Sequence, residues 1–263
     1  MIRENVVFGP ISSRRLGSSL GVNLLPRDGK LCNFDCIYCE CGWNADGLDD
    51  RRLPTRGEVR AALEDRLGGM MLNGETFDTI TFSGDGEPTL HPEFAGIIED
   101  IRFLRDTFFP KVRISVLSNA TRIHIPEVAA ALMSIDNPIL KIDAPDNALA
   151  AIINRPAPGY DVARVIEAMA PFKGNFVLQT MFLRGAGFDS SSPEVLNPWM
   201  DMVRRLAPRE IMVYTIDRPT PMQGLSAIPV EEMRTLVAPL SEEGFNIKIY
   251  GPAASQNDPS KYR

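Results

Sequence analysis

The chain has 263 residues, of which 44% are hydrophobic and 24% are charged, as in ordinary globular proteins. Its formal net charge of −6 argues against a large basic surface for nucleic acid, although a single basic stripe remains compatible with it. No apolar run approaches the ~20 residues of a membrane span, and the first residues lack the apolar core of a signal peptide. We therefore expect a cytoplasmic protein with no membrane partner.

The N-terminal stretch is punctuated by Gly, Pro and Ser, so we expect an irregular N-terminal segment over residues 1–20. Arg14 and Arg15 stand together in it beside small hydroxyl residues. They form either a solvated loop or a clamp for a carboxylate or phosphate, since guanidinium groups bind both. A short strand is expected at residues 21–26, where a proline ends it.

All four cysteines lie in one short segment after this strand: Cys32, Cys36, Cys39 and Cys41. Zinc knuckles separate their cysteine pairs by a dozen or more residues, ferredoxins have a different spacing, and disulfide frameworks belong to short secreted chains. The first three cysteines have the spacing Cys-x3-Cys-x2-Cys. Because a cubane [4Fe–4S] cluster normally takes four cysteines, three of them leave one iron open. An open iron is what binding and reductive cleavage of S-adenosylmethionine (SAM) requires.

Strands and helices alternate through the rest of the chain. Thr55 and Glu58 fit a capping box at the start of a helix whose apolar positions run to Met71. Ser192 followed by Pro193 marks the start of another helix, with the serine as its cap. Further strands are expected at residues 77–82, 112–117, 138–143, 175–182, 210–216 and 246–250, and helices at 92–109, 126–134, 147–154, 161–172 and 230–243.

This alternation predicts a parallel sheet with both faces covered, because its strands are almost continuously apolar. Six βα units and a trailing strand fall short of the eight units of a full barrel. We therefore predict the α/β class, with an open parallel sheet and outer helices forming a partial (β/α)6 TIM-like barrel. One domain is expected over residues 1–251, followed by a loose tail over residues 252–263.

Polar residues stand at the carboxyl ends of the predicted strands, where α/β barrels carry their active sites. They are the stretch 83–87, then Ser118 and Asn119, Asp143, Gln179 and Thr180, and Asp217 and Arg218. In the first stretch, Gly84 and Gly86 allow the backbone to approach a ligand closely, and a carboxylate beside them can bind an ammonium group. A tight turn with surface acids is the alternative reading.

Two motifs resemble the radical SAM superfamily. Cys-x3-Cys-x-aromatic-Cys, with Tyr38 as the aromatic residue, is similar to its cluster motif, and residues 85–88, Asp-Gly-Glu-Pro, are similar to its Gly-Gly-Glu-Pro motif. More closely, the stretches 8–10, 13–17, 19–22 and 83–92 resemble the bacterial and archaeal iron–sulfur oxidoreductases related to the wybutosine-synthesis enzyme. The stretches that begin at Lys141 and Gln179 fit the same group.

This resemblance implies roles for individual residues. The cluster ligands would be Cys32, Cys36 and Cys39. The residues that bind SAM would be Tyr38 at the adenine, Gly84, Asp85, Gly86 and Glu87 at the methionine amino group, Ser118 and Asn119 at the ribose or carboxylate, and Gln179. The resemblance places Lys141 and Asp143 on the SAM or substrate side but names no catalytic residue, so Cys41, Lys141 and Asp143 are only candidates for a catalytic role. Cys41 is a candidate by its position and not by the resemblance: it is a small residue packed under the loop, a hydrogen-atom donor or redox partner near the pocket, or a ligand in the absence of SAM.

The resemblance also implies a reaction. The chain would cleave SAM to a 5′-deoxyadenosyl radical that abstracts hydrogen from a substrate, with flavodoxin or ferredoxin as the reductant. The substrate would be a nucleoside in RNA. An activating enzyme that makes a glycyl radical on a partner protein and a non-enzymatic iron–sulfur redox module are the alternatives. No cysteine precedes Cys32, so we expect no second cluster.

Overall fold

The computed structural model describes residues 5–47 and 50–252, and the chain divides into two compact units. Unit 1 comprises Met1–Asn33 and Trp43–Ile139, and unit 2 comprises Phe34–Gly42 and Leu140–Arg263. The longer strands form an eight-stranded sheet with the order β1-β2-β3-β4-β5-β6-β9-β11, in which β5 is Asn137–Lys141. No described helix is long and apolar enough to cross a membrane. Of the tail predicted over residues 252–263, all but the first residue lies outside the described residues.

The described part of unit 1 opens with a β-hairpin, so the prediction of an irregular segment over residues 1–20 is wrong for residues 7–20, while residues 1–4 lie outside the described residues. β1 (Val7–Ser13) pairs antiparallel with β2 (Gly17–Val22), which begins earlier than the strand predicted at residues 21–26. The register shifts between Phe8 and Ile11, so the Gly and Pro at positions 9 and 10 form a bulge within a strand. Arg14 and Arg15 lie in the turn of this hairpin.

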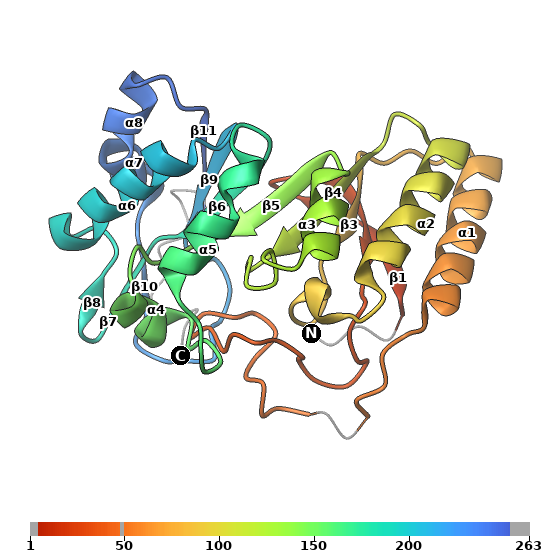
Figure 1. Cartoon of the computed structure of the whole chain (residues 1–263), viewed down its shortest axis with the longest axis horizontal. Helices are drawn as coiled ribbons and strands as arrows, with labels where there is room; N and C mark the ends of the chain where they lie inside the picture. The colour runs from red at the N-terminus through yellow and green to blue at the C-terminus, as the bar shows by residue number, and fades with distance from the viewer. Residues whose placement is uncertain (1–4, 48–49, 253–263) are drawn as a thin grey trace. The chain divides into compact units, whose positions relative to one another are not determined.

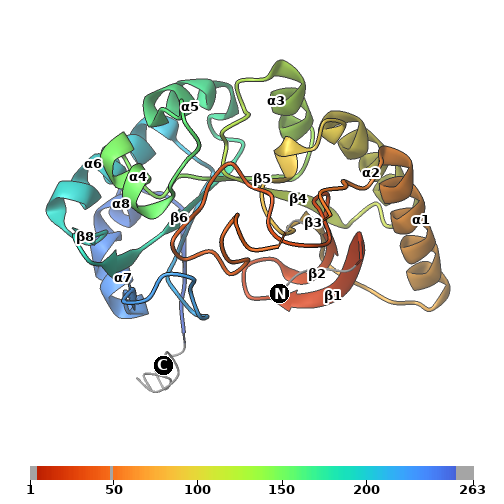
Figure 2. The ribbon, with the colours of Figure 1, turned by 90° about the horizontal axis from the view of Figure 1, so that it is seen from below.

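The remaining strands of unit 1 are β3 (Thr79–Phe82) and β4 (Arg113–Ser118), which continue in parallel from β2. Three helices, α1 (Arg56–Leu72), α2 (Phe94–Phe108) and α3 (Pro126–Met133), lie side by side along these strands (Figures 1 and 2). A 3-10 turn, η1 (Pro88–Leu90), precedes α2. The predicted capping box is confirmed, because Thr55 accepts from the amide of Glu58 and the Glu58 side chain bonds back to Thr55.

Unit 2 contains the parallel strands β6 (Val177–Met181), β9 (Glu210–Tyr214) and β11 (Ile247–Tyr250). Its helical segments are α4 (Asn147–Ile153), α5 (Val162–Ala168), η2 (Ala170–Phe172), α6 (Pro193–Leu206), α7 (Val230–Leu236) and α8 (Ala238–Glu242). The single helix predicted over residues 230–243 is therefore wrong. Pro239 has no amide hydrogen and its ring clashes with the preceding turn, so the helix breaks at Val237. Ser192 does precede α6, but its side chain makes no capping hydrogen bond.

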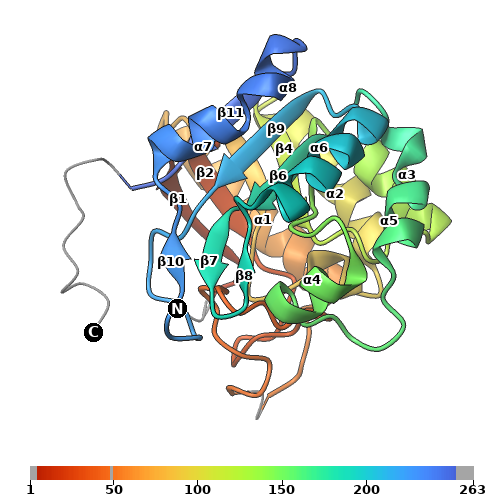
Figure 3. The ribbon, with the colours of Figure 1, turned by 90° about the vertical axis from the view of Figure 1, so that its left-hand side faces the viewer.

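A second, three-stranded sheet in unit 2 was not expected from the sequence (Figure 3). It has the order β10-β7-β8, with the strands β10 (Ser226–Ala227), β7 (Leu183–Gly185) and β8 (Phe188–Asp189). Two or three residues are too few for an alternating pattern to show in a sequence. Arg184 forms an ion pair with Asp189 within this sheet and a second one with Glu232 of α7, which connects the sheet to that helix.

Candidate functional site

The segment that carries the cysteines, Lys30 to Gly42, is hereafter the cysteine segment. Its first residues pair with the glycine loop, residues 83–88, which follows β3. Leu31 donates its amide to Asp85 O at 2.9 Å and accepts from the amide of Glu87 at 3.1 Å. Gly86 has φ of 140°, and a Cβ there would lie 1.8 Å from Leu31 O. Only glycine therefore allows the chain to dock here, one residue before Cys32.

Gly84 has a similar role in the same loop. A Cβ on Gly84 would lie 1.9 Å from Asn23 Oδ1. Asn23 is buried, accepts from the amide of Asp85 at 3.3 Å and donates to the Asp85 carboxylate at 3.4 Å. The sequence predicted that these glycines would allow a ligand to approach the backbone. In the structure, Gly84 and Gly86 allow the loop to approach Asn23 and Leu31 of its own chain.

Glu87 ties the glycine loop to the end of β4. Its Oε1 accepts from Ser118 Oγ at 2.8 Å and from the hydroxyl and amide of Thr89 at 2.6 and 3.1 Å, and its Oε2 accepts from Asn119 N at 2.7 Å. Burial raises the pKa of Glu87, and these four donors oppose that shift by stabilising the carboxylate. The carboxylate thus fixes the positions of two other predicted site residues, Ser118 and Asn119.

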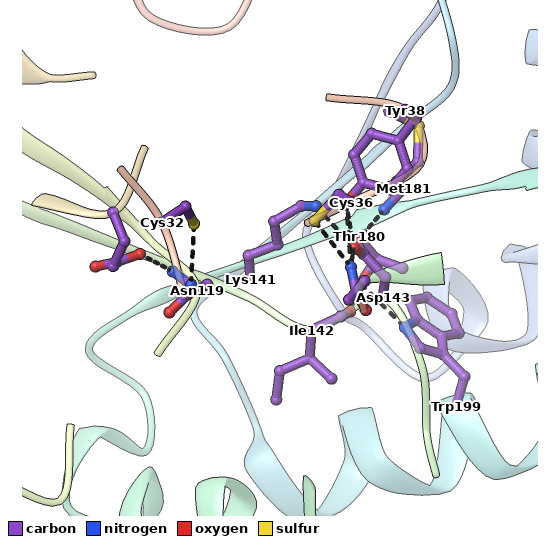
Figure 4. A network of polar contacts seen from close by, with 12 residues as sticks. Cys32, Cys36, Tyr38, Asn119, Lys141, Ile142, Asp143, Thr180, Met181 and Trp199 are labelled. Atoms are coloured by element: carbon purple, nitrogen blue, oxygen red, sulfur yellow. Dashed lines mark hydrogen bonds and ion pairs between the residues drawn. The ribbon is translucent and has the colours of Figure 1, made fainter. Parts of the chain in front are cut away.

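Asn119 in turn contacts the cysteine segment in unit 1. Its Nδ2 donates to Asn33 Oδ1 at 2.7 Å and lies 3.7 Å from Cys32 Sγ (Figure 4). Its Oδ1 accepts from the hydroxyl of Thr121 at 2.7 Å. Unit 1 therefore brings Cys32, the glycine loop and the polar end of β4 together, as the sequence predicted.

The predicted residues of unit 2 gather around the fully buried carboxylate of Asp143 (Figure 4). Its Oδ2 accepts from Lys141 Nζ at 2.7 Å, from Asn154 Nδ2 at 2.6 Å and from the Tyr38 hydroxyl, while Oδ1 accepts from Met181 N at 2.9 Å. The Lys141 ammonium also lies 4.2 Å from the centre of the Tyr38 ring, a cation–π contact. This network fixes the relative positions of Tyr38, which is predicted to lie at the adenine of SAM, and of Lys141 and Asp143, which are candidates for a catalytic role.

Burial and neighbouring charges shift the pKa values of Lys141 and Cys36 in opposite directions. Burial by itself lowers the pKa of Lys141, but the neighbouring Asp143 carboxylate more than reverses the effect, so the pKa lies above its ordinary value. Burial raises the pKa of the Cys36 thiol to about 11, although Lys141 acts in the opposite direction. The Cys36 thiol is therefore protonated near neutral pH, and an iron ion that binds it must displace the proton.

Gln179 and Thr180 lie within β6, because the strand continues to Met181. The Thr180 hydroxyl donates to Ile142 O at 2.7 Å and accepts from Trp199 Nε1 at 3.1 Å, so its role is structural. Adjacent strand residues face opposite sides, so Gln179 faces away from Trp199. Gln179 is buried, and within the part of the chain that the structure describes its Nε2 has no acceptor.

The cysteines themselves are half-buried, and none of them forms a disulfide. Over residues 5–47 and 50–252, no three His, Cys, Asp or Glu side chains are grouped so that they could hold one metal ion. A cubane cluster binds each thiolate on a different iron, so its ligands do not have to converge on one point as zinc ligands do. Beside the last two cysteines, Glu40 forms an ion pair with Arg218. Side-chain amides lie beside two of the cysteine sulfurs, Asn119 at Cys32 and Asn154 at Cys36, and thiols with such donors fit the chemistry of a [4Fe–4S] cluster.

Sequence reasoning missed the asparagines of the site, Asn23, Asn33 and Asn154. None of them belongs to a motif, and Asn23 and Asn33 are single polar residues between apolar or cysteine neighbours. The only sequence signal is for Asn154, which stands two residues before a proline, where a helix usually ends.

A mostly parallel α/β sheet with a cysteine segment paired to a glycine–glutamate loop fits the class of iron–sulfur enzymes that use SAM. A model of the Radical SAM superfamily matches residues 28–189, more than half of the sequence. The chain belongs to the radical SAM superfamily, and its cofactors are a [4Fe–4S] cluster and SAM.

Relatives and solved structures agree with this assignment. The chain is 29% identical over 242 residues to a UPF0026 protein of Methanocaldococcus jannaschii. The alignment covers 90% of this chain and 71% of that protein. Its fold is similar to a radical SAM methyltransferase of Sphaerobacter thermophilus, with a TM-score of 0.65, 17% identity, and coverage of 89% of this chain and 66% of that one. It is also similar to TYW1 with a lysine–pyruvate adduct bound, with a TM-score of 0.60, 14% identity, and coverage of 87% and 75%. The predicted partial-barrel fold class is confirmed.

Proposed function

We propose that Cys32, Cys36 and Cys39 hold the [4Fe–4S] cluster and leave one iron to SAM. The observation that carries this proposal is the pairing of Leu31 with Asp85 and Glu87, which joins the cysteine segment to the glycine loop one residue before the first ligand. When bound, the reduced cluster supplies the electron that splits SAM into methionine and a 5′-deoxyadenosyl radical. The residues of the chain hold and orient SAM and keep water away from it.

In this proposal the SAM amino group lies at Gly84, Asp85, Gly86 and Glu87. Because the Glu87 carboxylate already accepts four hydrogen bonds from the chain, its contribution is to hold the glycine loop, Ser118 and Asn119 in place. Ser118 and Asn119 contact the ribose or the carboxylate of SAM. Gln179 is a further donor to SAM in this proposal. Its buried Nε2 has no acceptor among the described residues, and a buried amide without an acceptor is costly unless a ligand provides one.

We propose Tyr38 for the adenine of SAM, and Lys141 and Asp143 for the substrate side. The substrate is a nucleoside in RNA. Arg14 and Arg15 in the hairpin turn supply cationic contacts to the phosphates of the RNA backbone. A flavodoxin or ferredoxin delivers the electron. Cys41 is not a ligand in this scheme, because a fourth thiolate would occupy the iron that SAM needs.

The test is anaerobic reconstitution with iron and sulfide, followed by addition of dithionite and SAM. We expect about four irons per chain and release of 5′-deoxyadenosine, since one cubane cluster contains four irons. Cys36→Ala should lose both, whereas the matched variant Cys41→Ser should keep both. Full cleavage of SAM by Cys36→Ala would contradict the assignment of the ligands.

The substrate is tested separately by comparing modified nucleosides in RNA from a deletion strain that carries either the wild-type gene or the Cys36→Ala gene. The expected result is one modified nucleoside that only the wild-type gene restores. Identical nucleoside profiles would rule out an RNA substrate and would direct the search to protein substrates.

A further inference from the structure

The last residue of α4, Ile153, and the residues that follow it contact the cysteine segment in unit 2. Ile153 O accepts from the amide of Ile37 at 3.0 Å, and Asn154 O accepts from the amide of Asp35 at 2.9 Å. Both residues that flank Cys36 are therefore tied to the same helix end. The backbone position of Cys36 is fixed on either side, which leaves its side chain as the part still to be oriented.

The side chain of Asn154 contacts that of Cys36. Asn154 is buried, and its Nδ2 donates to Cys36 Sγ at 3.4 Å and to Asp143 Oδ2 at 2.6 Å. The same nitrogen also lies 3.4 Å from the Tyr38 hydroxyl oxygen, whose own hydrogen is donated to Asp143. The two hydrogens of the amide are therefore shared among the sulfur, the carboxylate and this hydroxyl. The amide cannot be turned around, because its oxygen would then face the negative charge of Asp143.

Asp143 is itself held firmly. Lys141, the Tyr38 hydroxyl and the amide of Met181 all donate to it, so its carboxylate has little freedom to move. The amide of Asn154 is consequently aimed at the sulfur by an anchored carboxylate. The corresponding contact in unit 1, from Asn119 to Cys32, is longer at 3.7 Å.

We propose that Asn154 is a positioning residue which directs the Cys36 sulfur toward the cluster and raises the reduction potential of that cluster. This inference rests on the proposed function, since it requires Cys36 to be a cluster ligand. A hydrogen bond to a ligating sulfur stabilises negative charge, and the reduced cluster carries one more electron than the oxidised cluster. The N–H···S bond therefore favours the reduced state, and the same bond restrains the sulfur against loss of iron.

The test compares wild type with Asn154→Leu, which keeps the size of the side chain and removes the donor, and with Asn154→Ser, whose hydroxyl is too short to bridge both acceptors. The matched control is Asn73→Leu, because Asn73 is also the C-cap of a helix but belongs to α1. The measurements are the midpoint potential of the cluster, from a redox titration followed by electron paramagnetic resonance, and the rate at which a chelator removes iron.

We expect both Asn154 variants to have a more negative midpoint potential than wild type and to lose iron several-fold faster, while Asn73→Leu matches wild type in both. Equal potentials in a cluster-loaded Asn154→Leu or Asn154→Ser and in wild type would overturn the inference and leave the proposed function intact. A wild-type protein that takes up no cluster would instead contradict the proposed function itself, so the two failures are distinguishable.

Discussion

The cysteine segment is held at two places, and the two anchors differ in kind. In unit 1, Leu31 pairs with the glycine loop across Gly86, where a Cβ would lie 1.8 Å from a backbone oxygen. In unit 2, Asp35 and Ile37 donate to carbonyl groups at the end of α4, and there Arg155 adopts a left-handed backbone with φ of 45°. The first anchor depends on the absence of a side chain. The second consists of backbone hydrogen bonds, to which the side chain of Asn154 adds a contact with Cys36.

This difference teaches how each anchor can fail. Any side chain at Gly86 must push the Leu31 backbone away, so the first anchor tolerates no substitution. The carbonyl groups of the second anchor are present whatever residues carry them, so only the buried amide of Asn154 is specific to the sequence. Variants at the first anchor should therefore change stability, and variants of Asn154 should mainly change the chemistry of the sulfur.

The largest effect is expected for Gly86→Ala. The added Cβ cannot fit between the glycine loop and Leu31, and overpacking together with backbone strain should lower the free energy of unfolding by about 3 kcal/mol. Urea denaturation of the metal-free protein measures this loss.

The matched control for that variant is Gly69→Ala in α1, where a Cβ would meet nothing within 4 Å. Alanine favours a helix over glycine by roughly 0.5–1 kcal/mol, so this variant should be slightly more stable than wild type. If Gly86→Ala unfolds at the same urea concentration as Gly69→Ala, the close contact at Leu31 does not exist in solution.

A smaller loss is expected for Asn23→Ala, which leaves Gly86 in place but removes the support of the glycine loop. The buried amide and carboxylate of Asp85 both lose a partner, at a cost of roughly 2–3 kcal/mol. Thermal and urea unfolding both report it. An unchanged free energy of unfolding would show that Asp85 finds other partners, and that this anchor does not depend on Asn23.

At the second anchor, Arg155→Gly is expected to be more stable than Arg155→Ala. The left-handed conformation costs a non-glycine residue about 1–2 kcal/mol, which glycine does not incur, although glycine loses more entropy on folding. Both variants remove the contacts of the arginine side chain, so urea denaturation should show a difference of up to about 1 kcal/mol in favour of glycine. Equal free energies of unfolding for the two variants would mean that residue 155 is not left-handed in solution.

The smallest effect is expected for Arg218→Ala. Its ion pair with Glu40 lies beside Cys39 and Cys41, but both side chains are more than half exposed. Such pairs contribute at most about 1 kcal/mol and are screened by salt. The melting temperature at high salt should match that of wild type, and a large drop there would reveal a third anchor of the cysteine segment.

The first anchor was largely predictable and the second was not. Glycine and glutamate directly after an apolar strand, together with three closely spaced cysteines, are local patterns that a sequence displays. The end of α4 lies more than a hundred residues after Cys36, and nothing in the sequence around Asn154 indicates that its amide meets a sulfur. The hairpin at residues 7–22 was missed for a different reason, because the Gly and Pro of its bulge at positions 9 and 10 are residues typical of irregular chain.

The sequence predicted polar residues at the ends of the strands, and the structure describes their contacts within each unit. In unit 1, Ser118 and Asn119 lie beside Glu87, and Asn119 lies beside Cys32. In unit 2, Asp143 accepts from Lys141. Thr180 lies inside β6, and its hydroxyl contacts Ile142 and Trp199. Because adjacent strand residues face opposite sides, the sequence does not specify which of Gln179 and Thr180 packs against the helix.

The central claim is that three cysteines hold the cluster and leave one iron for SAM. Electron paramagnetic resonance of the dithionite-reduced cluster, recorded with and without SAM, tests it most directly in wild type and in Cys41→Ser. The account predicts that SAM alters the spectrum of both proteins in the same way, because SAM binds the open iron in each. A spectrum that SAM leaves unchanged in wild type, or a Cys41→Ser protein without iron, would contradict it.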